Sequence, residues 1–469
     1  MDAPVNIDAA APAPALTSVS ATARDLVGLA APLIVHNLAN MGMQFTDTLM
    51  AGRLSAATLA AVAVGGSVFM PVLLFALGVL MALSPTVAQL YGAGERRTIG
   101  GYVRQTLWLS QIVGWAGFVL LRHAAPLLSG IGIAPSLVPL AQDYLVAISW
   151  GLPAMCLFLV LRFTSEGIAH TRPMLFIALF GLALNAVLDY ALIYGAFGLP
   201  RWGAYGCGLA SAIAMWLMFF ALLAYVFRSR HYRPLAIFVR FEWPRIAPLG
   251  ELIRLGTPIA ISVFMEGSLF AAAALLMGTL GTDIVAAHQI AVNFAAIMFM
   301  VPMGVAMAIT ARVGQARGRG DAVAARRIGL TGIALCMGFM ALSALAMASF
   351  PGVIAGWYTD NAQVRDIAVT LLGIAAIFQI SDGLQVSAAG ALRGFKDTRV
   401  PMWITVLAYW AVGFTLAWVL GVYAGLGPRG VWGGLIAGLS VAAVLLNLRF
   451  LRISRVRFVP PVVADESIV

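Results

Sequence analysis

Four carboxylic acids lie inside long apolar segments of the chain, where a charged side chain is costly. They are Asp47, Asp189, Glu266 and Asp382. At the centre of a membrane-spanning helix a charged side chain costs about 2.5–3.5 kcal/mol on insertion scales, so each acid needs a structural or functional reason. The apolar segments that contain them hold no Lys or Arg at a comparable depth, which argues against buried salt bridges. A proton, a sodium ion and an organic cation would therefore compete for these carboxylates.

A stripe of polar side chains leads up to Asp47. His36, Asn40 and Gln44 precede it at intervals of four, four and three residues, which places all four on one face of a helix. A polar seam that hydrogen-bonds to neighbouring helices explains the first three residues as well as a functional role does. For Asp47 a function is favoured, because an amide would form the same seam at a lower cost.

Amide side chains accompany the other acids. Asn185 lies four residues before Asp189, so the two share a helix face and could offer a carbonyl oxygen and a carboxylate to a proton or a hard cation. The second half of the chain has similar residues: Gln379 and Gln385 near Asp382, and Gln289 and Asn293 on one helix face.

The composition requires these segments to be membrane helices. Of the 469 residues, 61% are hydrophobic and 10% are charged, and the mean hydropathy is +0.94. An ordinary globular chain is about one-quarter charged, so a water-soluble or disordered protein is excluded. Apolar runs of about 20 or more residues can each cross a bilayer as a helix, and they predict twelve spans. We expect these spans to begin near residues 25, 57, 104, 141, 174, 207, 252, 284, 328, 367, 401 and 431.

The distribution of basic residues predicts how the helices are oriented. All but five of the 29 Lys and Arg residues fall in the tails and in alternate polar breaks between the spans. Cytoplasmic loops are enriched in Lys and Arg, so both termini and the arginine-rich loops are expected in the cytoplasm. The net charge of +10 therefore reflects membrane topology, and we expect no nucleic-acid partner.

The two halves of the chain are related by an internal repeat. A shift of 226 residues aligns residues 26–94 with 252–320 without a gap and matches 16 of 69 positions. The matched pairs include Gly78 with Gly304, Gln89 with Gln315 and Gly92 with Gly318, and a shift of 227 pairs Gly167 with Gly394. With six spans in each half, the halves are expected to be parallel repeats about an axis along the membrane normal. The predicted fold class is an all-α integral membrane protein with twelve transmembrane helices in two six-helix lobes.

The predicted domain boundaries follow from these spans. Residues 1–24 are expected to form a disordered cytoplasmic tail, 25–227 the N-lobe with helices 1–6, and 228–251 a cytoplasmic linker. Residues 252–451 are expected to form the C-lobe with helices 7–12, and 452–469 a second cytoplasmic tail. The first tail has no basic residue before residue 24, so it does not resemble a cleavable signal peptide.

The three cysteines are scattered through apolar stretches. Cys156, Cys207 and Cys336 show no spacing typical of metal ligands, and we interpret each as a small packing residue. We therefore expect neither a disulfide nor a zinc site.

Several segments together resemble the multidrug and toxic compound extrusion (MATE) family, and within it the NorM branch. The most specific are residues 45–52 around Asp47, 264–270 around Glu266, 286–294, and 387–397 after Asp382. The resemblance covers almost the whole chain and implies an exporter of cationic, amphipathic drugs or dyes in a bacterial inner membrane. It implies a transporter without enzymatic activity, cofactor or ATP, with H+ or Na+ as the coupling ion. The expected partners are small organic cations and membrane lipid, and the expected state is a monomer.

The resemblance also assigns roles to individual residues. By motif match, Asp47, Glu266 and Asp382 take the positions of the family's essential membrane acids, and Gln289 falls where the second lobe contacts substrate. The supporting polar side chains are expected to be His36, Asn40, Gln44, His288, Asn293, Gln379 and Gln385.

The coupling ion stays open between protons and sodium. Asn185 and Asp189, with Asp47, resemble the first-lobe cation site of the DinF-like branch, so one candidate sodium site lies there and a second lies at Glu266 and Asp382. Sodium-coupled NorM proteins have a tyrosine four positions before the tenth-span aspartate, whereas this chain has Phe378. The missing hydroxyl favours protons over sodium without excluding sodium.

The predicted mechanism is antiport by alternating access. The carboxylates would hold an organic cation, and external protons or sodium ions would displace it outward. One alternative is a flippase of related fold for a lipid-linked precursor, but that class favours basic cavity residues that meet phosphates, whereas acids outnumber bases in these spans. A second alternative is an integral-membrane enzyme, which would need a nucleophile, a metal-ligand set or paired acids near an interface, and the sequence has no such pattern.

Overall fold

The computed structural model describes residues 18–130 and 132–455, which fold into helices and loops with no strand. Ten helices are long and apolar enough to cross a membrane, and a pair bent by 44° makes an eleventh span. The helix over Arg96–Arg122 is of similar length but carries more arginines. Each of the twelve predicted starts falls no more than eight residues after the start of one of these helices. The prediction of an all-helical membrane protein is confirmed.

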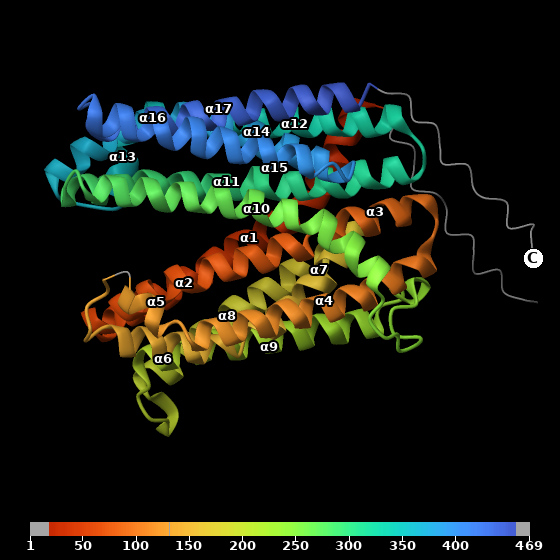
Figure 1. Cartoon of the computed structure of the whole chain (residues 1–469), viewed down its shortest axis with the longest axis horizontal. Helices are drawn as coiled ribbons and strands as arrows, with labels where there is room; N and C mark the ends of the chain where they lie inside the picture. Colours follow the sequence, from red (N-terminus) through yellow and green to blue (C-terminus); the bar gives the residue numbers. More distant parts are fainter. Residues whose placement is uncertain (1–17, 131, 456–469) are drawn as a thin grey trace, which may run out of the picture.

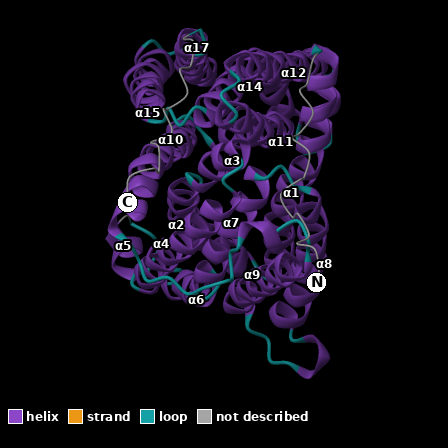
Figure 2. Ribbon diagram, turned by 90° about the vertical axis from the view of Figure 1, so that its right-hand side faces the viewer, coloured by secondary structure: helices purple, strands orange, loops and turns teal. Residues whose placement is uncertain are grey.

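The helices form two bundles that are seen side by side in Figure 1 and end-on in Figure 2. The first bundle contains α1 (Val19–Leu54), α2 (Ala56–Leu80), α3 (Leu83–Ala93), α4 (Arg96–Arg122), α5 (Ala125–Gly130), α6 (Val138–Ser149), α7 (Leu152–Gly167), α8 (Arg172–Tyr194), η1 (Ala196–Gly198) and α9 (Gly203–Arg228). After η2 (Arg233–Leu235), the second bundle contains α10 (Ile246–Gly278), α11 (Thr282–Gly318), α12 (Ala322–Ser349), α13 (Pro351–Gly356), α14 (Ala362–Gly394) and α17 (Gly427–Ile453). Its remaining span is continuous from α15 (Arg399–Val406) through η3 (Leu407–Phe414) and α16 (Thr415–Trp418) to η4 (Val419–Tyr423).

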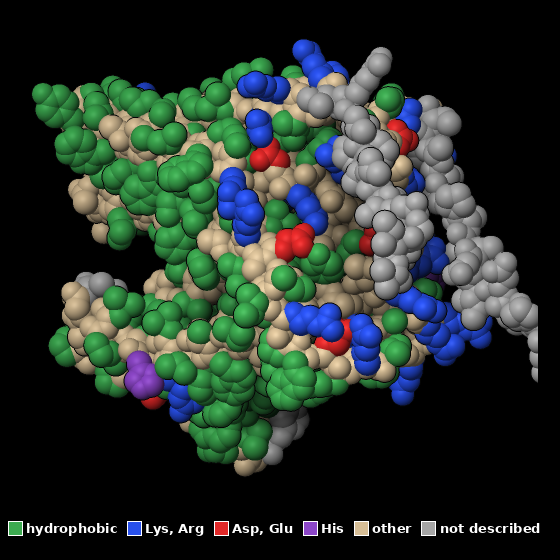
Figure 3. All heavy atoms as spheres, turned by 45° about the vertical axis from the view of Figure 1, so that its right-hand side comes forward, with side chains coloured by type: hydrophobic (Ala, Val, Ile, Leu, Met, Phe, Trp, Pro, Cys, Tyr) green, Lys and Arg blue, Asp and Glu red, His purple; other side chains and the backbone are tan. Residues whose placement is uncertain are grey.

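The bundles touch on one side of the molecule and are separated on the other. They meet where α1 begins and α17 ends and where the Lys and Arg side chains gather, and Figure 3 shows a hollow between them at the opposite side. We call the two sides the terminal side and the open side.

Close helix crossings between the bundles follow the internal repeat. A Cβ on Gly78 of α2 would lie 2.3 Å from the Cα of Ala260 in α10, and a Cβ on Gly304 of α11 would lie 3.1 Å from the backbone nitrogen of Ile34 in α1. Ala260 is the repeat equivalent of Ile34, as Gly304 is of Gly78. The bundles therefore touch through equivalent residues in both directions, as a two-fold relation requires.

Several boundaries differ from those expected from the sequence. Residues 19–24, assigned to the first tail, already belong to α1, whose N-cap is Ser18, and residues 1–17 of that tail lie outside the described residues. Residues 246–251, assigned to the linker, are the first turns of α10. Helix α17 continues through residue 453, and residues 456–469 of the predicted second tail lie outside the described part. We use linker below for residues 229–245.

Candidate functional site

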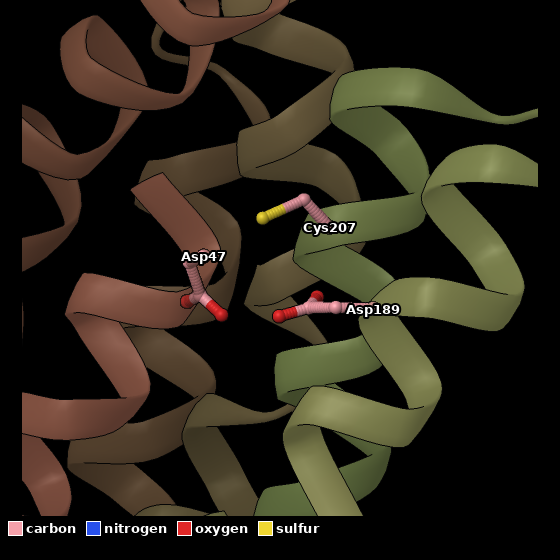
Figure 4. A group of neighbouring side chains, drawn as sticks. All are labelled: Asp47, Asp189 and Cys207. Atoms are coloured by element: carbon pink, nitrogen blue, oxygen red, sulfur yellow. The ribbon is translucent and has the colours of Figure 1, made fainter. Parts of the chain in front are cut away.

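The first bundle brings two of the predicted acids together. Asp47 of α1 and Asp189 of α8 point toward each other, and Cys207 of α9 lies beside them (Figure 4). One oxygen of each carboxylate and the Cys207 Sγ all lie within 4.8 Å of one another. Ser211, one turn further along α9, donates a hydrogen bond to Asp47 Oδ2 at 3.1 Å. Three helices distant in sequence therefore build one acidic cluster.

Several polar atoms of this cluster have no hydrogen bond of ordinary length. Asp189 and Asn185 are both 0% exposed, and within the described residues their side-chain oxygen and nitrogen atoms make no such bond, although both side chains lie close enough to Asp47 to interact with it. Asp47 Oδ1 is also without a partner there. Buried polar groups are normally satisfied, and two carboxylates at this distance repel each other when both are charged. The cluster therefore favours a bound proton or cation between the two acids.

The donor atoms decide which ion fits. Carboxylate, amide and hydroxyl oxygens from Asp47, Asp189, Asn185 and Ser211 suit a hard cation such as sodium. The thiol of Cys207 is a soft and weak ligand for such an ion, although it does not impede a proton. The residues thus fit either coupling ion, and the thiol favours the proton.

The polar stripe of α1 divides into two parts. His36 is fully buried, stacks on Phe158 of α7 with ring centroids 6.0 Å apart, and its Nε2 lies 3.1 Å from Asn40 Nδ2. Gln44 is exposed. The structure therefore places His36 and Asn40 in a contact within the first bundle, and only Asp47 of the stripe lies in the acidic cluster.

The second bundle brings Glu266 of α10 and Asp382 of α14 together. Gln385, one turn after Asp382, donates a hydrogen bond to Glu266 Oε1 at 3.1 Å, and Asp382 is close enough to Glu266 for the two carboxylates to repel each other. Asp382 is 4% exposed and its Oδ1 has no partner in the described part of the chain. This second acidic pair also favours a proton or a cation.

Aromatic rings form the surroundings of this pair. Phe378 is 2% exposed and meets Phe270 and Trp432 edge-on at centroid distances of 5.9 and 5.6 Å. His288 contacts Trp432 in the same way at 5.7 Å. Phe378 therefore fills an apolar position between helices.

The remaining predicted polar residues make other contacts or are exposed. Gln379 donates a hydrogen bond to Ser343 of α12 at 3.3 Å. Gln289 and Asn293 are exposed on the first turns of α11. Among the described residues, no hydrogen bond joins these three side chains to Asp382.

One sequence expectation about charge is only partly met. No ion pair between described residues involves Asp47, Asp189, Glu266 or Asp382, but the guanidinium of Arg393 on α14 attracts Glu266 electrostatically. Further toward the terminal side, Arg162 and Glu166 of α7 are both 3% exposed and form an ion pair of 2.8 Å. Both residues lie within α7, which continues through Gly167.

Two glutamines join the bundles on the terminal side. Gln89 Nε2 of α3 donates to the Gly394 carbonyl of α14 at 2.9 Å, and Gln315 Nε2 of α11 donates to the Gly167 carbonyl of α7 at 2.9 Å. Donors and acceptors are matched pairs of the internal repeat. We call these two hydrogen bonds the glutamine latch.

The latch depends on a close approach of α3 and α11. A Cβ on Gly92 would lie 2.1 Å from the Gln315 carbonyl oxygen, and a Cβ on Gly318 would lie 1.9 Å from the Gln89 carbonyl oxygen. Only glycine therefore fits at these two crossing points. The repeat identities at both glycines and both glutamines were the sequence signal for this contact.

Sequence reasoning missed three further residues near the acids. Cys207 was interpreted as a packing residue, and Ser211 and Tyr409 were not singled out. Tyr409 is 0% exposed, and its hydroxyl, which lies in the π-helical segment η3, has no partner among described atoms. No spacing signal could reveal these residues, because α9 and η3, which carry them, hold none of the four acids.

Comparisons with known proteins identify the family. The sequence model of the MatE family matches residues 32–191 and 258–419, one segment in each half. A probable multidrug resistance protein NorM of Xanthomonas axonopodis pv. citri is 46% identical over 427 residues, covering 91% of this chain and 93% of that protein. The multidrug resistance protein PmpM of Pseudomonas aeruginosa is 43% identical over 446 residues, covering 94% and 93%.

Solved structures agree in fold. The eukaryotic MATE transporter AtDTX14 superimposes with a TM-score of 0.85 at 20% identity, covering 93% of this chain and 99% of that one. An outward-facing multidrug resistance MATE family transporter of the MOP superfamily gives a TM-score of 0.85 at 21% identity, covering 93% and 97%. With a family model that matches both halves and relatives above 40% identity over nine-tenths of the chain, this protein belongs to the MATE family, whose members are membrane transporters and not enzymes.

Proposed function

We propose that this protein exports cationic, amphipathic organic molecules in exchange for protons or sodium ions that move inward. The observation that carries the proposal is the pair of acidic clusters, Asp47 with Asp189 and Glu266 with Asp382, one in each bundle. Carboxylates with unpaired oxygens in an apolar interior attract any cation that reaches them. The curated relatives named for multidrug resistance support organic cations as the exported class.

Exchange would follow from competition for the same oxygens. A carboxylate that holds a proton or a sodium ion no longer attracts an organic cation, so the two ligands favour different states of the protein. With both termini in the cytoplasm, the described conformation faces outward, because the bundles are closed on the terminal side and separated on the open side. Transport would require the glutamine latch to break as the bundles close on the open side.

Protons are the favoured coupling ion. Cys207 places a soft ligand beside the first cluster. Phe378 offers no hydroxyl to the second cluster, although the buried hydroxyl of Tyr409 lies near that pair. Neither feature removes the carboxylate oxygens that a sodium ion would use. We further propose that the protein works as a monomer in a bacterial inner membrane.

Dye efflux from vesicles tests the proposal and identifies the ion. Purified protein is reconstituted into vesicles loaded with ethidium, and a pH gradient or a sodium gradient is imposed separately. We expect the pH gradient to drive dye movement and the sodium gradient to drive little or none. Dye movement equal to that of protein-free vesicles under both gradients would overturn the proposal.

A further inference from the structure

A cavity remote from both acidic clusters lies where the linker covers the first bundle. It has a volume of about 500 Å³, within the range of small-molecule sites, and its walls come from α4, α7, α9 and residues 237–242 of the linker. Figure 1 shows this part of the chain (green) at the terminal side of the first bundle. The proposed transport cycle uses none of its residues.

The linker wall of this cavity is firmly attached to α4. Arg104 Nη1 donates to the carbonyls of Ala236 and Ile237 at 2.6 and 3.0 Å. Trp108 Nε1 donates to the Glu242 carbonyl at 3.0 Å, and the Trp108 ring stacks on Trp243 with centroids 6.2 Å apart. These contacts therefore hold the linker in place as one wall of the cavity.

The inner wall is apolar and lies near the terminal-side ends of its helices. It contains Leu107, Leu157, Leu161, Phe219 and Leu223. Measured along their helices at 1.5 Å per residue, these side chains lie roughly 8 to 17 Å from the helix ends of the terminal side. For helices that end at the outer edge of the headgroups, this range runs from the headgroup boundary into the hydrocarbon.

The rim combines exposed apolar and basic side chains. Val239, Phe241, Trp243 and Ile246 are 77%, 71%, 73% and 90% exposed, which is unusual for side chains in water but typical of a membrane interface. Residues 228–254 contain six arginines and only two glutamates. Such a basic segment beside membrane helices attracts anionic lipid.

Arg240 is the basic group at the mouth of the cavity. Its side chain is 68% exposed, and its Nε pairs with Glu242 Oε1 at 2.6 Å, while neither Nη atom is hydrogen-bonded to a described residue. Hydrogen bonds from Arg104 and Arg240 hold the pKa of Glu242 below its ordinary value, so this carboxylate stays charged and bound to both arginines. The Nη atoms of Arg240 remain available for an anion from outside.

We propose that this cavity binds an anionic membrane phospholipid, with an acyl chain along α4, α7 and α9 and the phosphate at Arg240. An organic cation does not fit the mouth, because two arginines face the single carboxylate there. A soluble anion does not account for the apolar inner wall or for the exposed aromatic rim.

Native mass spectrometry of the purified full-length protein tests this site. The protein is released from detergent with an equimolar mixture of phosphatidylglycerol and phosphatidylcholine, and the lipids that remain bound are counted. We expect preferential retention of one phosphatidylglycerol. Arg240→Gln should reduce that preference about fivefold, the effect of one arginine near a lipid headgroup, and Leu223→Trp should reduce binding of the lipid by filling the cavity.

The matched control is Arg399→Gln, which removes an exposed arginine at the terminal side of the second bundle. It should leave the preference for phosphatidylglycerol unchanged. Equal losses in Arg240→Gln and Arg399→Gln, or no loss in Leu223→Trp, would overturn the proposed site. Displacement of the lipid by an equal concentration of glycerol 1-phosphate would do the same, since it would indicate a site for free anions.

Discussion

Asp382→Asn is expected to lower ethidium export by about ten- to a hundredfold, because a hydrogen bond or contact with a charged group contributes about 1.5–3 kcal/mol. The amide keeps the shape of the buried side chain and removes its negative charge. The second acidic cluster would then lose the group that attracts both the organic cation and the coupling ion. Export by cells that express equal amounts of variant and unchanged protein measures the effect.

Ser381→Ala is the matched control for this prediction. Ser381 is the neighbour of Asp382 on α14, but its hydroxyl contacts Ser440 of α17 at 2.8 Å and not the acidic pair. This variant should export ethidium at the normal rate. Normal export by Asp382→Asn and by Glu266→Gln would contradict the role assigned to the second cluster.

Loss of the glutamine latch should favour opening of the terminal side. Each of the two hydrogen bonds contributes about 1 kcal/mol net, so the double variant Gln89→Ala, Gln315→Ala should shift the equilibrium between closed and open terminal sides about 30-fold. Hydrogen–deuterium exchange in α3 and at the end of α14 should rise, because these segments become accessible when the bundles part. The two single variants should have similar effects, since the residues are equivalent in the repeat.

Gln142→Ala controls for the simple loss of a glutamine hydrogen bond. Gln142 Nε2 donates to the Arg122 carbonyl at 2.9 Å, and both residues belong to the first bundle. Its replacement should leave exchange in α3 and α14 unchanged. If the double latch variant also leaves exchange unchanged, the two hydrogen bonds do not control the terminal side.

The helices and the repeat were predictable because their signals are carried by many residues. An apolar run of about 20 residues is still recognisable when one of its residues is polar, so all twelve predicted starts correspond to helices. Some identities of the repeat lie at contacts between the bundles. They are the pair Gly78 and Gly304 and the pair Gln89 and Gln315. A sequence alone shows that such residues match and does not show that they touch.

The site was only partly predictable, because its groups come from separate helices. Asp47 and Asp189 were expected near a cation, but Cys207 and Ser211 reach them from α9 at a separation in sequence that no motif records. Charged residues usually end a span, whereas the ion pair between Arg162 and Glu166 allows both to lie buried within α7. The helix boundaries and the side chains that contact the acids therefore depend on packing between helices, which the sequence alone does not show.

The central claim is that the same carboxylates bind the exported cation and the coupling ion in turn. Equilibrium binding of ethidium to the purified protein, measured as a function of pH and of sodium concentration, tests it most directly. We predict that the affinity for ethidium falls as the pH is lowered, because protonated carboxylates no longer attract the cation, and that Asp382→Asn weakens this dependence. An affinity that changes with neither pH nor sodium would contradict the account.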